Sequence, residues 1–173
     1  MPNPDAHPAM TIDLPDEDAT HQLATRLAPM LCGTHPSLPD LPAGGRIHLR
    51  GDLGAGKTTF ARGLLRAAGI KGRIKSPSYA LLESYNLSNL HFYHLDFYRF
   101  SDSLEWIDAG FRDILDDANV VLIEWPERAG NVLPPPDLDV HLDYTSSGRQ
   151  AVLVAHSEKG RIWLTTLATH RSS

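Results

Sequence analysis

Residues 51–58 of the chain are Gly51-Asp52-Leu53-Gly54-Ala55-Gly56-Lys57-Thr58. This run fits the complete P-loop pattern, in which spaced glycines precede a lysine and a hydroxyl residue. The glycines permit backbone conformations that are closed to other residues, so the loop's N–H groups and the next helix N-terminus can converge on phosphate. In this pattern Lys57 contacts the β- and γ-phosphates and the Thr58 hydroxyl binds Mg²⁺. A glycine-rich loop that merely caps a helix is the structural alternative.

The segments on either side of this run have the structure that a P-loop requires. Residues 47–49 alternate between apolar and polar side chains, which predicts a short strand that leads into Gly51. Residues 57–68 carry apolar side chains at helical spacing, and Gly69 is placed to end that helix in a left-handed turn. The context therefore favours a phosphate site over a simple helix cap.

The rest of the chain alternates between helical and strand patterns, with antiparallel strands expected at its end. Residues 119–123 form an almost purely β-branched run, which is typical of a strand buried on both faces. Such alternation predicts an α/β layered sheet. The other expected elements are helices over 16–31, capped by Asp16 or Asp18, and 103–115, a loop and strand over 76–86, and strands over 90–95, 140–144, 151–156 and 161–167.

The composition is that of a single globular domain. The chain has 173 residues, 42% apolar and 21% charged, so we expect one domain over residues 12–168 between tails at 1–11 and 169–173. Cys32 is the only cysteine, which excludes an internal disulfide and suits a reducing compartment. No apolar run is long enough to span a membrane, and the first ten residues lack a signal-peptide pattern, so we expect a cytoplasmic protein without membrane contact.

The net charge of −5 disfavours direct binding to DNA or RNA. Five basic residues nevertheless cluster in the sequence, namely Arg62, Arg66, Lys71, Arg73 and Lys75. A local basic patch and a solvated helix face are both open interpretations, of which the solvated face is favoured because charge runs are usually surface features.

Hydrolysis of a nucleotide needs an acid that binds Mg²⁺ and a group that orients or activates water. Glu124 directly follows the buried run 120–123, where such an acid is expected. Asp96 follows the strand predicted over 90–95, and it is a candidate for a general base or for a ligand of magnesium-bound water. Ser78 is a candidate sensor of the γ-phosphate. Exposed strand ends, a helix cap or an Arg99 partner are the structural alternatives.

Two other residue types have no role fixed by spacing. Trp125 follows Glu124 and is a candidate for stacking on a base, for docking a partner, or for a place in the core. The nine histidines are scattered, without metal-ligand spacing. His91 and His94 are interpreted as strand residues without an assigned role.

Four blocks of sequence, residues 51–59, 75–79, 93–99 and 123–127, occur in an order and spacing that resemble the bacterial TsaE (YjeE) family. The family comprises ATPases of tRNA threonylcarbamoyladenosine biosynthesis, and the resemblance extends over residues 12–167. It implies a P-loop NTPase three-layer sandwich with a mostly parallel central sheet and a small antiparallel C-terminal sheet. It also implies binding of ATP and Mg²⁺, and ATP hydrolysis that is slow in the isolated protein.

The same resemblance implies partners and residue roles. The family associates with the TsaB–TsaD pair, which modifies the adenosine beside the anticodon, so tRNA is reached only through the complex and hydrolysis resets it. The implied catalytic set is Lys57, Asp96 and Glu124, with Thr58 and Glu124 as Mg²⁺ ligands. Trp125 is implied to support activity or docking. Nucleotide contacts are implied for the loop through Thr59, and for Glu17, Ser78 and Arg149.

The chain departs from the family pattern at two places. Ser78 stands where the family usually carries threonine, which keeps the hydroxyl but holds it less stiffly. The proline-rich loop over residues 32–45 is longer than is typical of the family.

Two other functions remain as alternatives to a hydrolase. One is a nucleotide-gated docking module without essential hydrolysis. The other is a small-molecule kinase, which is disfavoured because no arginine-rich lid segment follows the P-loop.

Overall fold

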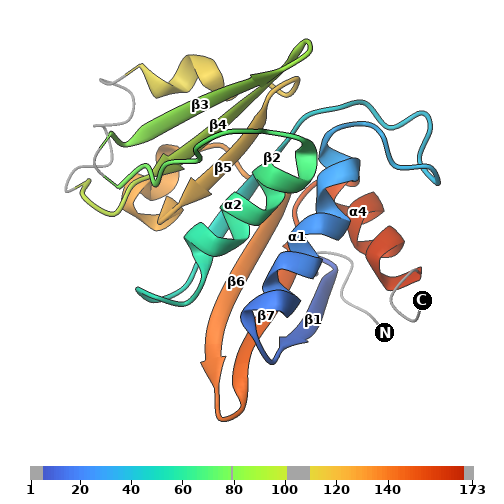
Figure 1. The fold of residues 1–173 in the computed structure, drawn as a ribbon, viewed down its shortest axis with the longest axis vertical. Helices are drawn as coiled ribbons and strands as arrows, with labels where there is room; N and C mark the ends of the chain where they lie inside the picture. Colours follow the sequence, from blue (N-terminus) through green and yellow to red (C-terminus); the bar gives the residue numbers. More distant parts are fainter. Residues whose placement is uncertain (1–5, 79, 101–109, 170–173) are drawn as a thin grey trace.

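A computed structural model describes residues 6–78, 80–100 and 110–169. Within these ranges the fold is built on one seven-stranded sheet (Figure 1). Its four central strands, β6, β2, β5 and β4, are parallel, and antiparallel strands flank them on both sides. In spatial order the strands are β1 (Ala9–Leu14), β7 (Gly148–Ala155), β6 (Leu138–Thr145), β2 (Gly45–Arg50), β5 (Val120–Glu124), β4 (Leu90–Asp96) and β3 (Leu82–Leu87). The predicted α/β architecture is confirmed.

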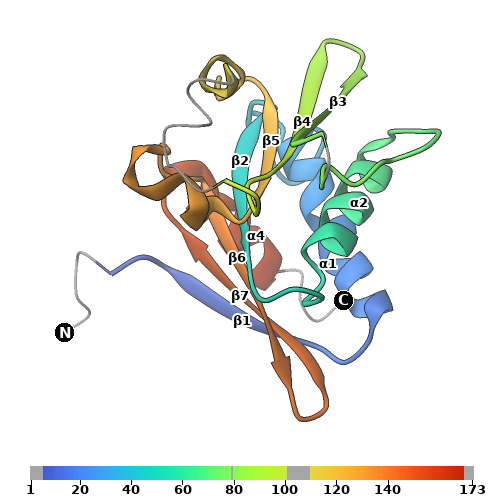
Figure 2. The same ribbon diagram turned by 90° about the vertical axis from the view of Figure 1, so that its left-hand side faces the viewer.

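Helical segments cover both faces of the sheet, which gives three layers (Figure 2). One face packs against α1 (Glu17–Leu31), α2 (Lys57–Ala68) and α4 (Glu158–Thr169), and α1 contacts both of the others. The other face is covered by the 3₁₀ segments η1 (Phe111–Ile114) and η2 (Pro126–Val132). In the described ranges, no helix is both long and apolar enough to cross a lipid bilayer.

Strand β5 joins the two halves of the core. All five of its residues are buried. Val120 and Leu122 belong to the core under the three α-helices, whereas Val121 and Ile123 belong to the core under the 3₁₀ segments. The strand therefore has apolar side chains on both faces, as its sequence predicts, and it holds Glu124 at a fixed position at its carboxyl end.

The boundaries of helices α1 and α2 have local causes. Helix α2 spans the predicted residues 57–68 and ends at Gly69, whose φ of 113° lies in the left-handed region. Helix α1 begins after Asp16, whose side chain accepts a hydrogen bond from the Ala19 N–H at 2.8 Å. These predictions are confirmed, because caps and helical spacing act over a few residues.

The N-terminal tail predicted over residues 1–11 extends too far into the chain. Strand β1 begins at Ala9 and pairs antiparallel with β7, so residues 9–11 form part of the sheet. Its apolar side chains, Met10 and Ile12, pack on the main core. The antiparallel hairpin of β6 and β7 also extends the central sheet directly rather than standing beside it.

The strand predicted over residues 161–167 is wrong, because these residues lie in α4. Residues 162–164 form a short apolar run that also suits a strand, but Trp163, Leu164 and Leu167 are buried together on one helix face. The Ser157 hydroxyl accepts a hydrogen bond from the Gly160 N–H at 3.0 Å at the helix N-terminus. Of the helix predicted over 103–115, residues 103–109 lie outside the described ranges and residues 111–114 form η1.

Candidate functional site

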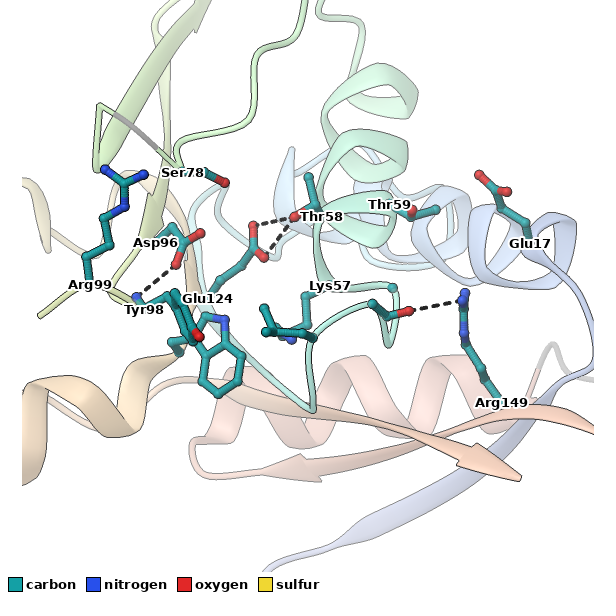
Figure 3. A pocket seen from close by; sticks show the side chains of 14 residues that line it. Glu17, Lys57, Thr58, Thr59, Ser78, Asp96, Tyr98, Arg99, Glu124 and Arg149 are labelled. Carbon is teal, nitrogen blue, oxygen red and sulfur yellow. Dashed lines mark hydrogen bonds between the residues drawn. The ribbon is translucent and has the colours of Figure 1, made fainter. Parts of the chain in front are cut away.

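The candidate site lies at the carboxyl ends of three parallel strands. The P-loop segment follows β2, Glu124 ends β5 and Asp96 ends β4. Strand register places Asp96 opposite Glu124. A cavity of about 380 Å³ opens there (Figure 3) and is lined by Glu17, Leu53, Gly54, Gly56, Lys57, Thr58, Thr59, Ser78, Asp96, Tyr98, Arg99, Glu124, Trp125 and Arg149. The carboxyl edge of a parallel sheet is where α/β proteins bind ligands.

The P-loop segment depends on glycine at two of its turns. Gly51 and Gly56 have φ values of 139° and 109°, which side chains rarely tolerate. A Cβ atom on Gly51 would also collide with the Leu142 carbonyl oxygen. Gly56 is the N-cap of α2 and provides no side-chain cap, in contrast to Asp16 on α1. The first N–H groups of α2 are therefore available to an anion.

The side chain of Lys57 folds back onto the backbone of the P-loop segment. Its Nζ donates to the carbonyl oxygens of Gly51 at 2.6 Å and Asp52 at 2.7 Å. Burial lowers the pKa of Lys57, and nearby carboxylates, Glu124 foremost, oppose that shift. The ammonium group also lies 4.4 Å from the centre of the Trp125 ring. Lys57 thus places a cation at the cavity, and no acidic side chain of the described ranges is bonded to it.

Glu124 is bonded from two sides. The Thr58 hydroxyl donates to it, with Oγ1 2.9 Å from Oε1 and 3.1 Å from Oε2. His94 Nε2 lies 2.6 Å from Oε2. Glu124 is 2% exposed and His94 0%. The sequence alone predicts no role for His94. Its place two residues before Asp96, on the same strand face, is the signal that could indicate a position beside the predicted acids.

Asp96 has few partners for a buried acid. It is 8% exposed, and its Oδ1 accepts a hydrogen bond from the Tyr98 N–H at 2.9 Å. Burial, more than any other cause, raises the pKa of Asp96, and the charge of Glu124 adds to the rise. Ser78 also lines the cavity, and its hydroxyl lies 2.7 Å from that of Ser76. The structure therefore brings both candidates to the same cavity as the P-loop segment.

The mouth of the cavity is aromatic on one side and charged on the other. Trp125 has a left-handed φ of 57°, and its ring centre lies 4.9 Å from that of Tyr98. Arg149 lies in β7, and its Nη2 donates a hydrogen bond to the Gly54 carbonyl oxygen at 3.0 Å. Glu17 lies across the cavity at the start of α1 (Figure 3). The predicted site residues that line the cavity come from six separate segments, namely Glu17, positions within 53–59, Ser78, Asp96, residues 124–125 and Arg149.

The residues present fit a nucleotide and a divalent cation. Because the Thr58 hydroxyl donates its hydrogen bond to Glu124, the lone pairs of its oxygen are free for a cation. In the described part of the chain, no cluster of three His, Cys, Asp or Glu residues is arranged to hold a metal ion. Mg²⁺ commonly binds one or two carboxylates plus substrate phosphates, so this site would need the phosphates to complete the coordination.

Comparison with known proteins gives one consistent family. A family model described as "Threonylcarbamoyl adenosine biosynthesis protein TsaE" matches residues 14–151. A tRNA threonylcarbamoyladenosine biosynthesis protein TsaE from Haemophilus influenzae is 36% identical over 153 residues, which covers 88% of this chain and 94% of that protein. The protein of the same name from Rickettsia conorii is 36% identical over 118 residues, 66% of this chain and 67% of that protein.

A solved structure has the same fold. The crystal structure of YdiB from Bacillus subtilis superposes with a TM-score of 0.70 and covers 95% of this chain and 97% of its own. The two sequences are 23% identical. The likeness therefore concerns the arrangement of the sheet and helices alone.

Proposed function

The chain belongs to the TsaE family, and we propose that it is the ATP-binding and ATP-hydrolysing subunit of the machinery for tRNA threonylcarbamoyladenosine biosynthesis. The observation that carries this proposal is the convergence of the P-loop segment, Thr58, Glu124 and Asp96 on one cavity. A cradle for phosphate alone would need no buried acids. Two acids at the adjacent ends of β4 and β5 support hydrolysis as well as binding.

Each of these residues has a task that follows from its contacts. The N–H groups at the start of α2 hold phosphate oxygens, and Lys57 adds a positive charge beside them. Thr58 and Glu124 would hold the cation, which would supply positive charge to neutralise the phosphates. Asp96 orients the attacking water and accepts its proton. Because burial raises the pKa of Asp96, its carboxylate is a stronger base than an exposed aspartate.

We further propose that hydrolysis resets a TsaB–TsaD complex in the cytoplasm and that tRNA meets this chain only through that complex. The net charge of −5 supports an indirect contact with tRNA. Trp125 and Tyr98, whose rings contact each other in a tilted arrangement at the cavity mouth, are placed where a docked partner would sense the bound nucleotide.

The test is ATP hydrolysis by the purified protein, alone and with the TsaB–TsaD pair, in the presence of Mg²⁺. We expect slow hydrolysis alone and strong stimulation by the pair. Lys57→Ala and Glu124→Ala should abolish both activities, and an exposed control outside the cavity such as Arg161→Ala should retain them.

The other outcomes point to the alternatives. ATP binding without any hydrolysis, even with the pair, would replace the proposal with a nucleotide-gated docking module. ATP consumption that depends on a metabolite and yields a phosphorylated product would replace it with a small-molecule kinase.

A further inference from the structure

We propose that His94 is a positioning residue that fixes the orientation of the Glu124 carboxylate toward the cation site. The inference rests on the proposed function, since it assumes that Glu124 serves a nucleotide-bound cation. His94 itself does not line the cavity and acts only through Glu124.

The strand register brings the two side chains together. Asp96 pairs with Glu124 across β4 and β5, and His94 pairs with Leu122. His94 and Asp96 lie two residues apart and so project from the same face of the sheet. Glu124 lies between the imidazole of His94 and the hydroxyl of Thr58, at 2.6 Å and 2.9 Å.

Thr58 alone does not fix the carboxylate. Its hydroxyl is nearly equidistant from the two oxygens, 2.9 Å from Oε1 and 3.1 Å from Oε2. The terminal torsion of a glutamate is broad and roughly two-fold, so this contact leaves the group free to turn. His94 contacts Oε2 only, which makes the two oxygens unequal and leaves Oε1 with the greater spare acceptor capacity.

The burial of His94 argues against a purely structural role. The ring is fully buried, its neighbours Phe92 and Leu95 are apolar and equally buried, and its Nδ1 has no hydrogen-bond partner among the described residues. An unpaired buried nitrogen destabilises a fold, so an apolar side chain would fill this space more favourably. Within the described ranges, the contact with Glu124 is the one hydrogen bond of this side chain and accounts for a histidine here.

The test measures how strongly Mg²⁺ enhances binding of a fluorescent ADP, N-methylanthraniloyl-ADP, with EDTA as the metal-free reference. His94→Leu should reduce the Mg²⁺ enhancement about 10- to 100-fold, the usual effect of losing a residue that orients a metal ligand. Affinity in EDTA should stay within about twofold, because the nucleotide contacts of the loop are intact. In hydrolysis assays with Mg²⁺, kcat for ATP should fall and KM should rise as the Mg²⁺ enhancement of binding is lost.

Three controls separate positioning from packing. His94→Gln, which can place an amide N–H near Oε2, should recover a large part of the enhancement, whereas His94→Leu should not. In a Glu124→Ala background, His94→Leu should have no further effect on the enhancement. His91→Gln changes an exposed histidine of the same strand and should behave as the parent.

The outcomes distinguish a failure of the role proposed for His94 from a failure of the proposed function. If the parent shows Mg²⁺ enhancement and folded His94→Leu keeps it, the role of His94 is overturned and the proposed function stands. If His94→Leu does not fold, an unchanged enhancement in a folded His94→Ala would overturn the role equally. If Mg²⁺ has no effect on the parent, the proposed function fails and the role of His94 fails with it.

Discussion

Two charged clusters lie at the sheet, and they differ in how their charges are matched. The Asp139 cluster consists of His48, Arg50, Glu127, Asp139 and His156. The Glu124 cluster consists of Lys57, Thr58, His94, Asp96 and Glu124. Both contain carboxylates, a cation and at least one buried histidine.

In the Asp139 cluster, charges of opposite sign meet directly. Arg50 Nε lies 2.9 Å from Asp139 Oδ1, and its Nη1 lies 3.3 Å from Glu127. In the Glu124 cluster, by contrast, Lys57 bonds carbonyl oxygens, and no Lys or Arg of the described chain forms an ion pair with Glu124 or Asp96. The first cluster is complete in the sense that its cation is paired with carboxylates, whereas the second leaves its cation and its acids open to groups from outside. We therefore propose that the unpaired cation and acids of the Glu124 cluster mark it as the functional one of the two.

The largest expected effect comes from changing one acid in each cluster. Asp96→Asn should lower kcat for ATP about 10²- to 10⁴-fold, the usual worth of a general base. Its amide oxygen can still accept from the Tyr98 N–H, so folding and nucleotide binding should change little. Hydrolysis assays and fluorescent-ADP titrations measure the two quantities separately.

Asp139→Asn is the matched control. It leaves Arg50 and His156 with a neutral partner and should lower the free energy of unfolding by about 1–3 kcal/mol, while kcat per folded molecule is unchanged. An Asp96→Asn protein that hydrolyses ATP at the parent rate would remove Asp96 from the catalytic set.

The two cations should show the next largest contrast. Lys57→Ala removes the basic side chain bonded to the Gly51 and Asp52 carbonyls and should weaken ATP binding by about 2–5 kcal/mol. Arg50→Ala should leave ATP binding within about twofold and lower the unfolding free energy instead, because Asp139 and Glu127 lose their partner. Calorimetric titration and urea unfolding of both variants check this. Equal loss of ATP affinity in both variants would contradict the division into open and complete clusters.

The features that sequence predicted well depend on short-range rules. The P-loop pattern, the span of α2 and its end at Gly69 follow from spacing and from glycine's conformational range. Glu124 and Asp96 could be placed because each follows an apolar run that marks a strand end. The sequence thus located the candidate site and most residues that line it.

The features that sequence missed depend on register and on distant contacts. His94 is recognisable only once β4 is aligned with β5, which sequence alone does not fix. The bond from Arg149 to the Gly54 carbonyl joins residues 95 positions apart. The sequence pattern of residues 161–164 is compatible with a strand as well as with a helix, because the span is so short. The helix α4 forms because it buries Trp163 against the sheet.

A pH-dependent stability should trace to His48 in the Asp139 cluster. Burial lowers the pKa of His48 from 6.5 to about 4, with Asp139 opposing the shift. Below pH 6.5 the unfolded chain protonates this ring while the folded chain does not until about pH 4, so stability is complete above 6.5 and falls as the pH drops. Between about pH 7.5 and about pH 5 the loss should be about 2 kcal/mol.

Urea unfolding of the parent and of His48→Leu at the two pH values checks this assignment. Carboxylates titrate in both proteins, so the difference between the two pH dependences isolates His48. The parent should lose more stability than the variant. Equal losses would assign the effect to other groups.

The smallest expected effect is at Ser78, which lies outside the strands and helices that hold the Glu124 cluster. Its hydroxyl is bonded to that of Ser76 at 2.7 Å, on a loop rather than on a strand end. Ser78→Thr restricts the side-chain rotamers, so it should raise kcat by no more than about two- to fivefold. Ser78→Ala should lower kcat by a comparable factor, and Ser76→Ala tests whether the hydroxyl pair is needed. Parent-like hydrolysis by Ser78→Ala would show that the cluster on the sheet acts without a hydroxyl from this loop.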